Sequence, residues 1–440
     1  MRKAIPVLLV LMLVLAAFVA CKQELEPEPH VHSLTKVEAV AATCEAAGNS
    51  AYYTCECGKF FSDAEGTTEI EEGSWVIAAL GHDFTNPTYD STLHKTTWTC
   101  SHDNSHTSSI VGQVLVTTGT STTGYETLEA AVAALPENAT ATIIVNEDIS
   151  VAETITLENR NITIMNRDGA DVTIQDAVTT HVTDTGSTSN QVARMFQISG
   201  SSNLVLTGNT TGKLKFQGAA SGSDAHTDCA RRVLFFMGTA AASRAAGMIT
   251  INDGVEVTGI YSSGGTSFGS IVRAYGKLTI NGGNFHDNYQ NGNAMFCIYD
   301  DCVVNNGTFS NNSSGGSSSC FQVAGGVATL TVNGGSFTNN TQNYSTIVCT
   351  KGTTTTINAG TFTGNKATLA NGNAGAAFHC NSDATAVLNI LGGTYSNNTN
   401  VDNVTRDLYA SAKGTVTIGT GVATFVTQAG TYINGVLQTE

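Results

Sequence analysis

One short phrase recurs through the second half of the chain, and this repetition limits the possible folds more than any other feature. The clearest copy reads LTVNGGSFTNN and begins at Leu330. The other copies are LTINGGNFHDN from Leu278, CVVNNGTFSNN from Cys302, TTINAGTFTGN from Thr355 and LNILGGTYSNN from Leu388. Their aromatic residues follow one another at intervals of 24 to 33 residues. A period of this size is typical of solenoids, in which each repeat forms one coil stacked on the next.

The pattern within each copy indicates the type of coil. Apolar and polar residues alternate over LTVN as they do in a strand with one buried face. A glycine pair then turns the chain, because glycine adopts positive φ angles without steric cost, and a second strand points its aromatic residue inward. A further apolar phrase, such as CFQVAGG from Cys320, precedes each copy. The sequence therefore predicts three short strands and three turns per coil: an all-β right-handed parallel β-helix.

Two sets of residues are predicted to stack from coil to coil. The asparagine pair after each aromatic residue is predicted to be structural, because Asn tolerates the left-handed region and identical side chains on stacked strands form ladders. The cysteines of the apolar phrases are predicted to stack as buried thiols. Disulfides between neighbouring coils are the alternative, since the coils lie about 4.8 Å apart and cysteines at that distance can be bridged. These cysteines are Cys297, Cys320, Cys349 and Cys380.

The start of the solenoid has its own signal. The stretch GYETLEAAVAALPENATATIIV begins at Gly124 and predicts a short helix, ended by Pro136, and then a strand. Leu128, Ala131, Val132 and Leu135 share one face of this helix. The helix-then-strand opening resembles the start of pectate-lyase-like β-helix proteins. The resemblance covers residues 124–440 in pattern but not in catalytic motif, so it implies a fold with a helical cap and no particular chemistry.

The first 21 residues have the layout of a signal peptide: Arg2 and Lys3, an apolar run, and small residues before Cys21. The ending AAFVAC resembles a bacterial lipoprotein signal, which implies a lipidated Cys21 and a membrane anchor at the outer membrane or cell surface of a bacterium. Ordinary secretion with cleavage near Ala20 and an uncleaved anchor are the alternatives. Residues 22–29 are then expected to form a solvated tether.

Residues 30–110 form a separate module that is rich in cysteine and histidine. Thiolates and imidazoles this close in sequence are typical zinc ligands, and one ion can stabilise a domain too small for its own core. The text from His32 to His82 resembles a module repeated in surface proteins of anaerobic bacteria, and residues 81–106 resemble a degenerate second copy. The hypothesis is a structural zinc site for which the proposed ligands are Cys44, Cys55, Cys57 and His82, with His32 and Cys100 as further candidates.

Other states of these cysteines remain open at this point. An exported protein meets oxidising conditions, and disulfides would then pair Cys55 and Cys57 with Cys44 or Cys100. Free thiols are the third possibility. A catalytic metal is not expected, since the chain has no His-Glu-x-x-His motif. Calcium is not expected either, because the repeat lacks the Gly-Gly-x-Gly-x-Asp pattern of calcium-binding nonapeptides.

Composition narrows the range of partners. The formal net charge is -16 and charged residues make up only 13% of the chain. No basic cluster is long enough to suggest a nucleic-acid partner. The abundant Ser, Thr and Asn offer hydrogen-bonding groups along one face of the β-helix, which favours adhesion or the binding of a glycan or a surface protein. Tyr261, Tyr289 and Tyr344 are candidates for stacking on sugars, with a simple role in turns as the alternative.

An enzyme is the second functional hypothesis. A lyase or hydrolase acting on an acidic polysaccharide needs clustered carboxylates and a basic residue. The best candidates, expected at similar heights on neighbouring coils, are Arg273, Tyr299, Asp300, Asp301 and Lys351. Further pairs are His286 with Asp287, His379 with Asp383, and surface ion pairs of Arg231 and Arg232 with Asp228. A third hypothesis makes the β-helix a rigid spacer.

Overall fold

The computed structural model describes residues 31–183, 191–218, 232–238, 247–262, 270–292, 294–316, 319–370, 372–380, 385–411 and 414–438. The chain separates into two compact units, one containing the residues up to Pro87 together with 97–108, the other containing 88–96 and the rest. The predicted signal peptide, Cys21, the tether, Asp228, Arg231 and Asp383 lie outside the described residues. Among the described residues, no helix has the length and hydrophobicity needed to cross a membrane.

The Cys/His-rich module consists of short strands. β1 (Leu34–Val37), β3 (Tyr52–Cys55), β4 (Phe60–Phe61) and β5 (Glu69–Ile70) form an antiparallel sheet, and β2 (Gly48–Asn49) pairs with β6 (Val76–Ile77). β7 (Phe84–Asp90), β8 (Lys95–Cys100) and β9 (Thr107–Val111) form a further sheet. The rings of Tyr52 and Trp75 stack at 4.0 Å beside Phe60, but the strands are too short to bury a large core.

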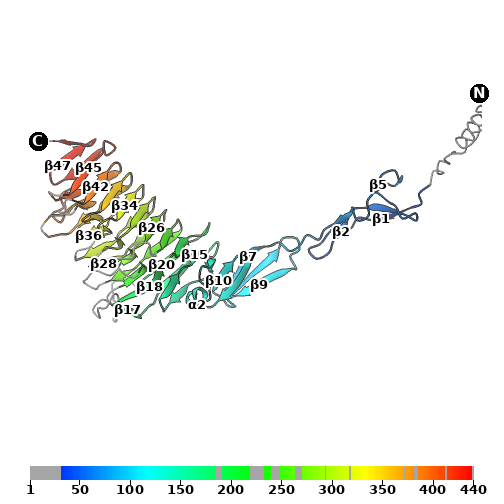
Figure 1. The fold of residues 1–440 in the computed structure, drawn as a ribbon. Coiled ribbons are helices and arrows are strands. Elements are labelled where there is room, and N and C mark those ends of the chain that lie inside the picture. The colour runs from blue at the N-terminus through cyan, green and yellow to red at the C-terminus, as the bar shows by residue number, and fades with distance from the viewer. Residues whose placement is uncertain are drawn as a thin grey trace, which may run out of the picture. The chain divides into compact units, whose positions relative to one another are not determined.

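The second unit is a right-handed parallel β-helix, so the predicted fold class is confirmed (Figure 1). Its described strands stack into long sheets, in which strands from successive coils are neighbours. Sheet 1 contains β10 (Val114–Thr118), β11 (Ser121–Tyr125), β12 (Thr140–Val145), β15 (Asn161–Asn166), β19 (Asn203–Thr207), β22 (Met248–Ile251), β26 (Lys277–Ile280), β30 (Asp301–Val304), β34 (Thr329–Val332), β38 (Thr354–Ile357), β42 (Val387–Ile390) and β45 (Thr415–Ile418).

Two more sheets complete the three faces that the sequence predicts. Sheet 2 contains β13 (Ile149–Val151), β16 (Val172–Asp176), β20 (Leu214–Gln217), β23 (Val255–Thr258), β27 (Asn284–His286), β31 (Thr308–Ser310), β35 (Ser336–Thr338), β39 (Thr361–Thr363) and β43 (Thr394–Ser396). Sheet 3 contains β14 (Ile155–Glu158), β17 (His181–Thr183), β18 (Gln191–Ser199), β21 (Arg232–Met237), β25 (Ser270–Ala274), β29 (Phe296–Ile298), β33 (Phe321–Val323), β37 (Ile347–Cys349), β41 (Phe378–Cys380), β44 (Leu408–Ala410), β46 (Thr424–Thr427), β47 (Gly430–Ile433) and β48 (Val436–Gln438).

A fourth sheet shows that three strands per coil is wrong for the central coils. The additional strands follow the corner that an asparagine pair occupies in several coils, and they are only two or three residues long. This is too short for any alternation of apolar and polar residues to reveal them. They pair in parallel between coils like the longer strands. Sheet 4 contains β24 (Tyr261–Ser262), β28 (Tyr289–Asn291), β32 (Ser313–Gly315), β36 (Thr341–Gln342) and β40 (Lys366–Ala367).

The repeated aromatic residues point inward, as predicted, and form a column of rings in the core. Phe285, Phe309, Phe337 and Phe362 are inaccessible to solvent, and consecutive rings stack with centroids 4.9, 4.7 and 4.5 Å apart. Phenylalanines from sheet 3 meet this column edge-on. Stacked and edge-to-face rings each contribute about 0.5–1.5 kcal/mol beyond the area they bury. The repeated aromatic residue therefore holds neighbouring coils together.

The asparagine pair has the structural role that the sequence predicts. The first residue of the pair sits at a corner with a positive φ, 54° at both Asn311 and Asn339. The second residue points inward and forms a ladder, in which each side-chain amide donates to the side-chain oxygen of the next coil over 3.0 Å. The members of this ladder are Asn288, Asn312, Asn340, Asn365 and Asn398.

The glycine pair makes the turn between sheets 1 and 2. Gly335 has a φ of 103°, and a Cβ added to it would lie 3.0 Å from the carbonyl oxygen of Gly307. A Cβ on Gly334 would lie 2.7 Å from the carbonyl oxygen of Asn305. Glycine is therefore required here both for its conformation and because the coils approach closely.

The two ends of the β-helix are built differently, and the first differs in part from the prediction. The expected helix is present as α2 (Leu128–Ala133): Thr127 caps it by accepting a hydrogen bond from the backbone N–H of Ala130, and Leu128, Ala131 and Val132 are buried. The cap also includes the antiparallel pair β10 and β11 before the helix, which the sequence did not indicate. At the other end, β46, β47 and β48 form an antiparallel meander.

The predicted cysteine ladder is wrong for two of its four members. Only Cys349 and Cys380 are partners in the strand register. Cys297 pairs with Gln322, and Cys320 lies just before β33, so neither continues the column. All four thiols are nevertheless buried and unbridged. Their spacing along the chain depends on turn lengths, and the strand register decides which of them align.

Candidate metal centres and a candidate ligand pocket

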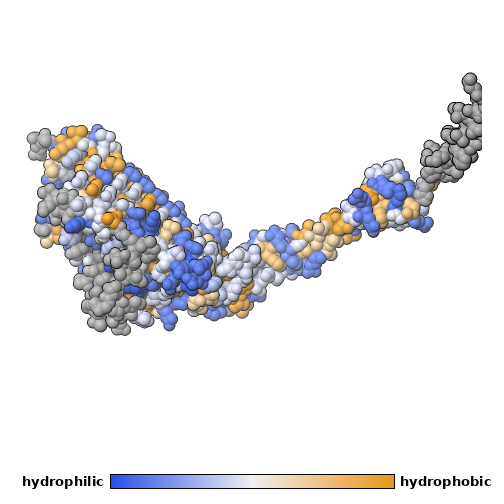
Figure 2. All heavy atoms as spheres, in the orientation of Figure 1, coloured by the Kyte–Doolittle hydropathy of each residue, from blue (hydrophilic) through white to orange (hydrophobic). Residues whose placement is uncertain are grey.

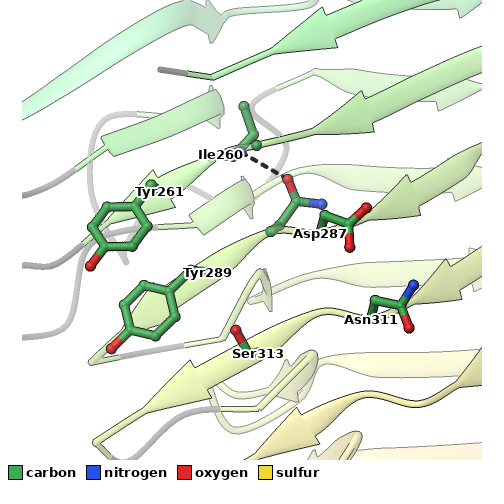
Figure 3. A pocket seen from close by; sticks show the side chains of 8 residues that line it. Ile260, Tyr261, Asp287, Tyr289, Asn311 and Ser313 are labelled. Carbon is green, nitrogen blue, oxygen red and sulfur yellow. Dashed lines mark hydrogen bonds between the residues drawn. The ribbon is translucent and has the colours of Figure 1, made fainter. Parts of the chain in front are cut away.

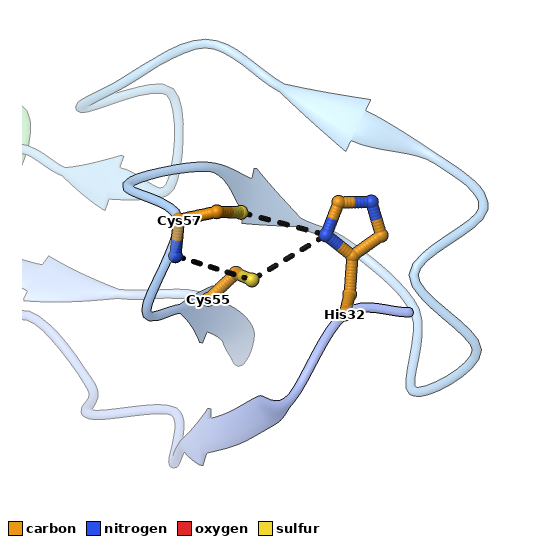
Figure 4. Close-up of side chains that lie close together, drawn as sticks. All are labelled: His32, Cys55 and Cys57. Carbon is orange, nitrogen blue, oxygen red and sulfur yellow. Dashed lines mark hydrogen bonds between the residues drawn. The ribbon is translucent and has the colours of Figure 1, made fainter. Parts of the chain in front are cut away.

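The first cysteine–histidine group lies inside the first copy of the module. His32 precedes β1, Cys55 ends β3, and Cys57 lies in the turn that leads to β4 (Figure 4). The Nδ1 atom of His32 is 3.4 Å from the Sγ atom of each cysteine. Ligand atoms around tetrahedral zinc are separated by about 3.5–3.8 Å, given Zn–S of about 2.3 Å and Zn–N of about 2.0 Å. The three donors therefore have the spacing of metal ligands.

A second group of the same composition lies between the two copies of the module. It contains Cys44, His82 and Cys100, whose ligand atoms all lie within 4.8 Å of one another. The Sγ atoms of Cys44 and Cys100 are 3.6 Å apart, and both cysteines are buried. Glu45 lies close by, with its Oε1 atom 3.9 Å from Nε2 of His82.

The pKa values of the second group favour one thiolate. Burial opposes ionisation of Cys100, but hydrogen bonds from His82 and from nearby backbone N–H groups outweigh it and lower the pKa of Cys100 to about 6. Burial raises the pKa of Cys44, and the adjacent Cys100 raises it further. A thiolate beside a thiol and an imidazole is a strong ligand for zinc and similar ions.

The structure divides the predicted ligands differently from the single site that was expected. Cys55 and Cys57 belong to one group and Cys44 and His82 to the other, with His32 and Cys100 completing them. The predicted disulfides between the two pairs do not fit this arrangement, because Cys55 and Cys57 face His32. The thiols of Cys44 and Cys100, by contrast, lie 3.6 Å apart. The sequence could not indicate this pairing, since 56 residues separate the two cysteines.

The residues proposed for lyase chemistry come together only in part. Arg273 is buried on sheet 3, where it donates to the hydroxyl of Tyr275 over 2.7 Å and lies 5.3 Å from the ring centre of Tyr299. Asp301 is on sheet 1 and accepts a hydrogen bond from Thr329. Asp300 lies at the turn before it and accepts from the backbone N–H of Asp301. Lys351 follows β37, two coils further along.

Other polar pairs also differ from the expected surface contacts. Arg232 is buried and donates to Asp176 over 2.6 Å and to the carbonyl of Val178 over 2.7 Å, so its predicted surface position is wrong. Among the predicted pairs, His286 and Asp287 are in contact, at 2.7 Å.

His379 is buried between two tyrosine rings. Its ring lies 5.1 Å from that of Tyr344 and 5.4 Å from that of Tyr409, and burial lowers its pKa to about 4. Tyr344, a candidate for stacking on sugars, therefore packs on His379.

A pocket of about 300 Å³ lies along sheet 4 (Figure 3). Tyr261 and Tyr289 form one side, with ring centroids 4.7 Å apart and ring planes 19° from parallel. Polar groups from the corners of the coils form the rest of the lining, including the carboxylate of Asp287, the amide of Asn311 and the hydroxyl of Ser313. The sequence singled out both tyrosines and Asp287, but it did not place them beside Asn311 and Ser313, since β28 and β32 were not predicted.

Charged residues gather on sheet 2 in the coils next to this pocket. Glu256 lies 2.9 Å from Lys213, 3.8 Å from Lys215 and 3.5 Å from His286. His286 in turn contacts Asp287, which lines the pocket.

Comparison with known proteins adds no assignment: no protein-family model, curated protein or solved structure matches this chain significantly. The geometry of the chain itself is therefore the basis for any functional conclusion.

Proposed function

We propose that this protein is a bacterial surface lipoprotein whose β-helix binds glycans at the pocket between Tyr261 and Tyr289. The observation that carries the proposal is the way these tyrosines depart from the repeat. In the strand register, Tyr261 and Tyr289 are followed by Ser313, Thr341 and Lys366 at the equivalent position. The fold thus accepts small or charged residues at this position and does not require an aromatic ring.

The corner beside the tyrosines departs from the repeat in the same way. Asp287 occupies the left-handed position that Asn311, Asn339 and Asn397 occupy in other coils. Asn suits this conformation at least as well as Asp does, so the carboxylate has no evident structural reason. Two independent departures from the repeat therefore meet in one pocket.

The chemistry of the lining suits a sugar. Pyranose rings present C–H groups to aromatic faces and hydroxyl groups to carboxylates, amides and hydroxyls. The stacked tyrosines supply the apolar surface, and Asp287, Asn311 and Ser313 supply polar groups at its edge. Ligand pockets typically combine apolar walls with a few polar groups of this kind. On the face of the β-helix that Figure 2 shows, hydrophilic and hydrophobic residues are interspersed.

The location belongs to the same proposal. The sequence MRKAIPVLLVLMLVLAAFVAC supports export and lipidation at Cys21. An acyl anchor would hold the β-helix at a bacterial surface, where glycans of a host or of other microbes are within reach. Labelling of cells with a radioactive or alkyne fatty acid tests this step, and we expect label in the wild-type chain and none in a Cys21→Ala variant.

The binding experiment uses the purified full-length protein and a panel of neutral and acidic polysaccharides. We expect saturable binding that Tyr289→Ala weakens by about tenfold or more, equivalent to about 1.4 kcal/mol. Tyr344→Ala is the matched control, because it removes the same ring from outside the pocket and should leave affinity unchanged. Affinity unaffected by Tyr289→Ala and by Asp287→Ala would overturn the proposal.

The same panel tests the alternative activity. New reducing ends, or ultraviolet absorbance of an unsaturated uronate, would show turnover and favour a lyase or hydrolase. Loss of that turnover in Asp301→Ala would then place the chemistry on the predicted patch instead of in the tyrosine pocket.

For the Cys/His-rich module we propose zinc as the bound metal. Each group contains two cysteines and a histidine, the donor set of structural zinc sites. His32 lies 3.4 Å from both thiols of its group and the thiols of Cys44 and Cys100 are 3.6 Å apart, which is close to the spacing of zinc ligands. The short strands of the module bury few hydrophobic residues, so metal binding would supply part of its folding free energy. Elemental analysis of the purified protein, with loss of secondary structure in the module on chelation, tests this proposal.

A further inference from the structure

We infer that the module binds two zinc ions, and that the second ion joins the two copies of the module to each other. The inference rests on the zinc proposal and goes beyond it in number, position and role. One ion lies within the first copy, at His32, Cys55 and Cys57. The other takes Cys44 from the first copy and His82 and Cys100 from the second, so that it bridges them.

The two sites correspond in their position on the strands. His32 lies two residues before β1, and His82 lies two residues before β7. Cys55 is the last residue of β3, and Cys100 is the last residue of β8. The backbone N–H of each of these cysteines also donates back across the following turn, from Cys55 to Lys59 and from Cys100 to His106. Each copy thus presents one histidine and one strand-end cysteine in the same way.

The third ligand differs between the sites, and this difference creates the joint. The first copy uses Cys57, two residues after Cys55, whereas the second copy has His102 at that position. The Nδ1 atom of His102 donates a hydrogen bond to the carbonyl of Gly81, 3.1 Å away, and His102 is not part of the second group. Cys44 of the first copy supplies the missing thiolate instead.

Backbone pairing brings Cys44 to the second copy. The N–H of Leu80 donates to the carbonyl of Thr43 over 2.9 Å, and that of Gly81 donates to the carbonyl of Cys44 over 3.0 Å. These bonds align residues 43–44 with residues 80–81, directly before His82. The thiol of Cys44 is therefore held next to the first ligand of the second copy.

The second site has further donors that fit a bound ion. Glu45 lies beside His82, and carboxylates next to a metal-bound histidine commonly orient its ring. The Nδ1 atom of His106 is shielded from solvent and has no hydrogen-bond partner among the described residues. Its ring centre is 4.9 Å from that of His82, and it forms a group with Glu45 and His82, so His106 is a candidate donor for the fourth position of the tetrahedron.

The experiment counts metal ions in the full-length protein and in single variants. Protein purified with a reductant is stripped of metal, titrated with Co²⁺ to read thiolate-to-cobalt charge transfer, and then loaded with Zn²⁺ for elemental analysis. We expect two ions per chain in the wild type. Cys57→Ser and Cys44→Ser should each lose one ion and keep the other, and the double variant should bind none. His94→Ala, which removes an imidazole outside both groups, is the control and should keep two.

The role as a joint has a separate readout. Hydrogen exchange measured by mass spectrometry should show faster exchange at residues 80–84 in Cys44→Ser than in the wild type. Cys57→Ser should leave the exchange of that segment unchanged. Faster exchange at 80–84 in both variants, or in neither, would overturn the bridging role.

The remaining outcomes separate this inference from the zinc proposal. One ion per chain that either single variant abolishes would indicate a single shared site, so zinc binding would stand and the two-site inference would fail. No metal in the wild type would overturn both. A Cys44–Cys100 disulfide in protein purified without reductant, persisting in the presence of Zn²⁺, would overturn the second site alone.

Discussion

The inner asparagine ladder allows a sharp test of what holds the coils together. Asn340 is inaccessible to solvent and its side chain makes four hydrogen bonds: it accepts from the backbone N–H and the amide of Asn312, and donates to the carbonyl of Phe309 and to Asn365. At about 1 kcal/mol of net stability per hydrogen bond, Asn340→Ala should cost about 4 kcal/mol. The cost is high because water cannot replace the lost partners at a buried site.

The same coil contains a matched control. Asn333 belongs to a second asparagine ladder on the outside, where it donates to Asn305 and accepts from Asn358, each over 2.8 Å. All three residues are exposed, so water replaces these bonds and Asn333→Ala should cost less than about 1 kcal/mol. Both substitutions remove the same atoms from the same coil, and the ladders differ mainly in burial.

The assay is guanidinium unfolding followed by far-ultraviolet circular dichroism, with midpoints compared because repeat arrays need not unfold in two states. Asn340→Ala should lower the midpoint several times more than Asn333→Ala does. Equal shifts, or a loss below about 1 kcal/mol at Asn340, would refute the argument that burial makes the inner ladder stabilising.

Three further expectations follow from other buried groups. In reduced protein stripped of metal, iodoacetamide at about pH 8 should modify the exposed Cys57 but not Cys349 or Cys380, because burial raises the pKa values of those two thiols to about 12 and about 11. Peptide mass spectrometry would detect any exception. Burial lowers the pKa of His379 to about 4, whereas in the unfolded chain it is about 6.5. As the pH falls, the unfolded chain therefore binds a proton first, and the free energy of unfolding should fall by roughly 3 kcal/mol between about pH 6.5 and pH 4. That fall should be smaller in His379→Phe when unfolding midpoints of the two proteins are compared at each pH. Arg232→Met should lower the free energy of unfolding by about 3–5 kcal/mol, because it leaves Asp176 buried without its ion-pair partner. Adding Asp176→Asn should recover part of that loss, and a double variant no more stable than the single one would contradict this account.

How well the sequence predicted each feature depended on whether that feature repeats. Phe309, Phe337 and Phe362 recur at one position of the pattern, and the asparagines recur at another, so each copy repeats the same evidence. The inward position of the aromatic residues and the asparagine ladder were predicted, and both are present. Because similar coils stack in register, residues that recur at one position of the sequence repeat lie next to one another on successive coils. The fold class could therefore be derived from the chain alone.

Features that occur once could not be derived in this way. The ion pair of Arg232 with Asp176 and the contact of Cys44 with Cys100 each join residues 56 positions apart. Such contacts depend on strand register and on the lengths of the turns between coils, which the repeat pattern leaves open. The same reason separated Cys297 and Cys320 from the predicted cysteine column. Sequence reasoning named the right residue types in these places but could not pair them.

This contrast also indicates where to look for function in a repeat protein. A residue that follows the repeat is accounted for by the coil it stabilises, whereas a residue that departs from it must be explained by something other than stacking. In this β-helix Lys215, Glu256, Tyr261, His286 and Tyr289 occupy neighbouring coils. At the same register positions the coils from Thr308 onward carry Ser and Thr, with Lys only at 366. Because the later coils show that the fold does not need these side chains, we expect the binding surface on the coils that carry them.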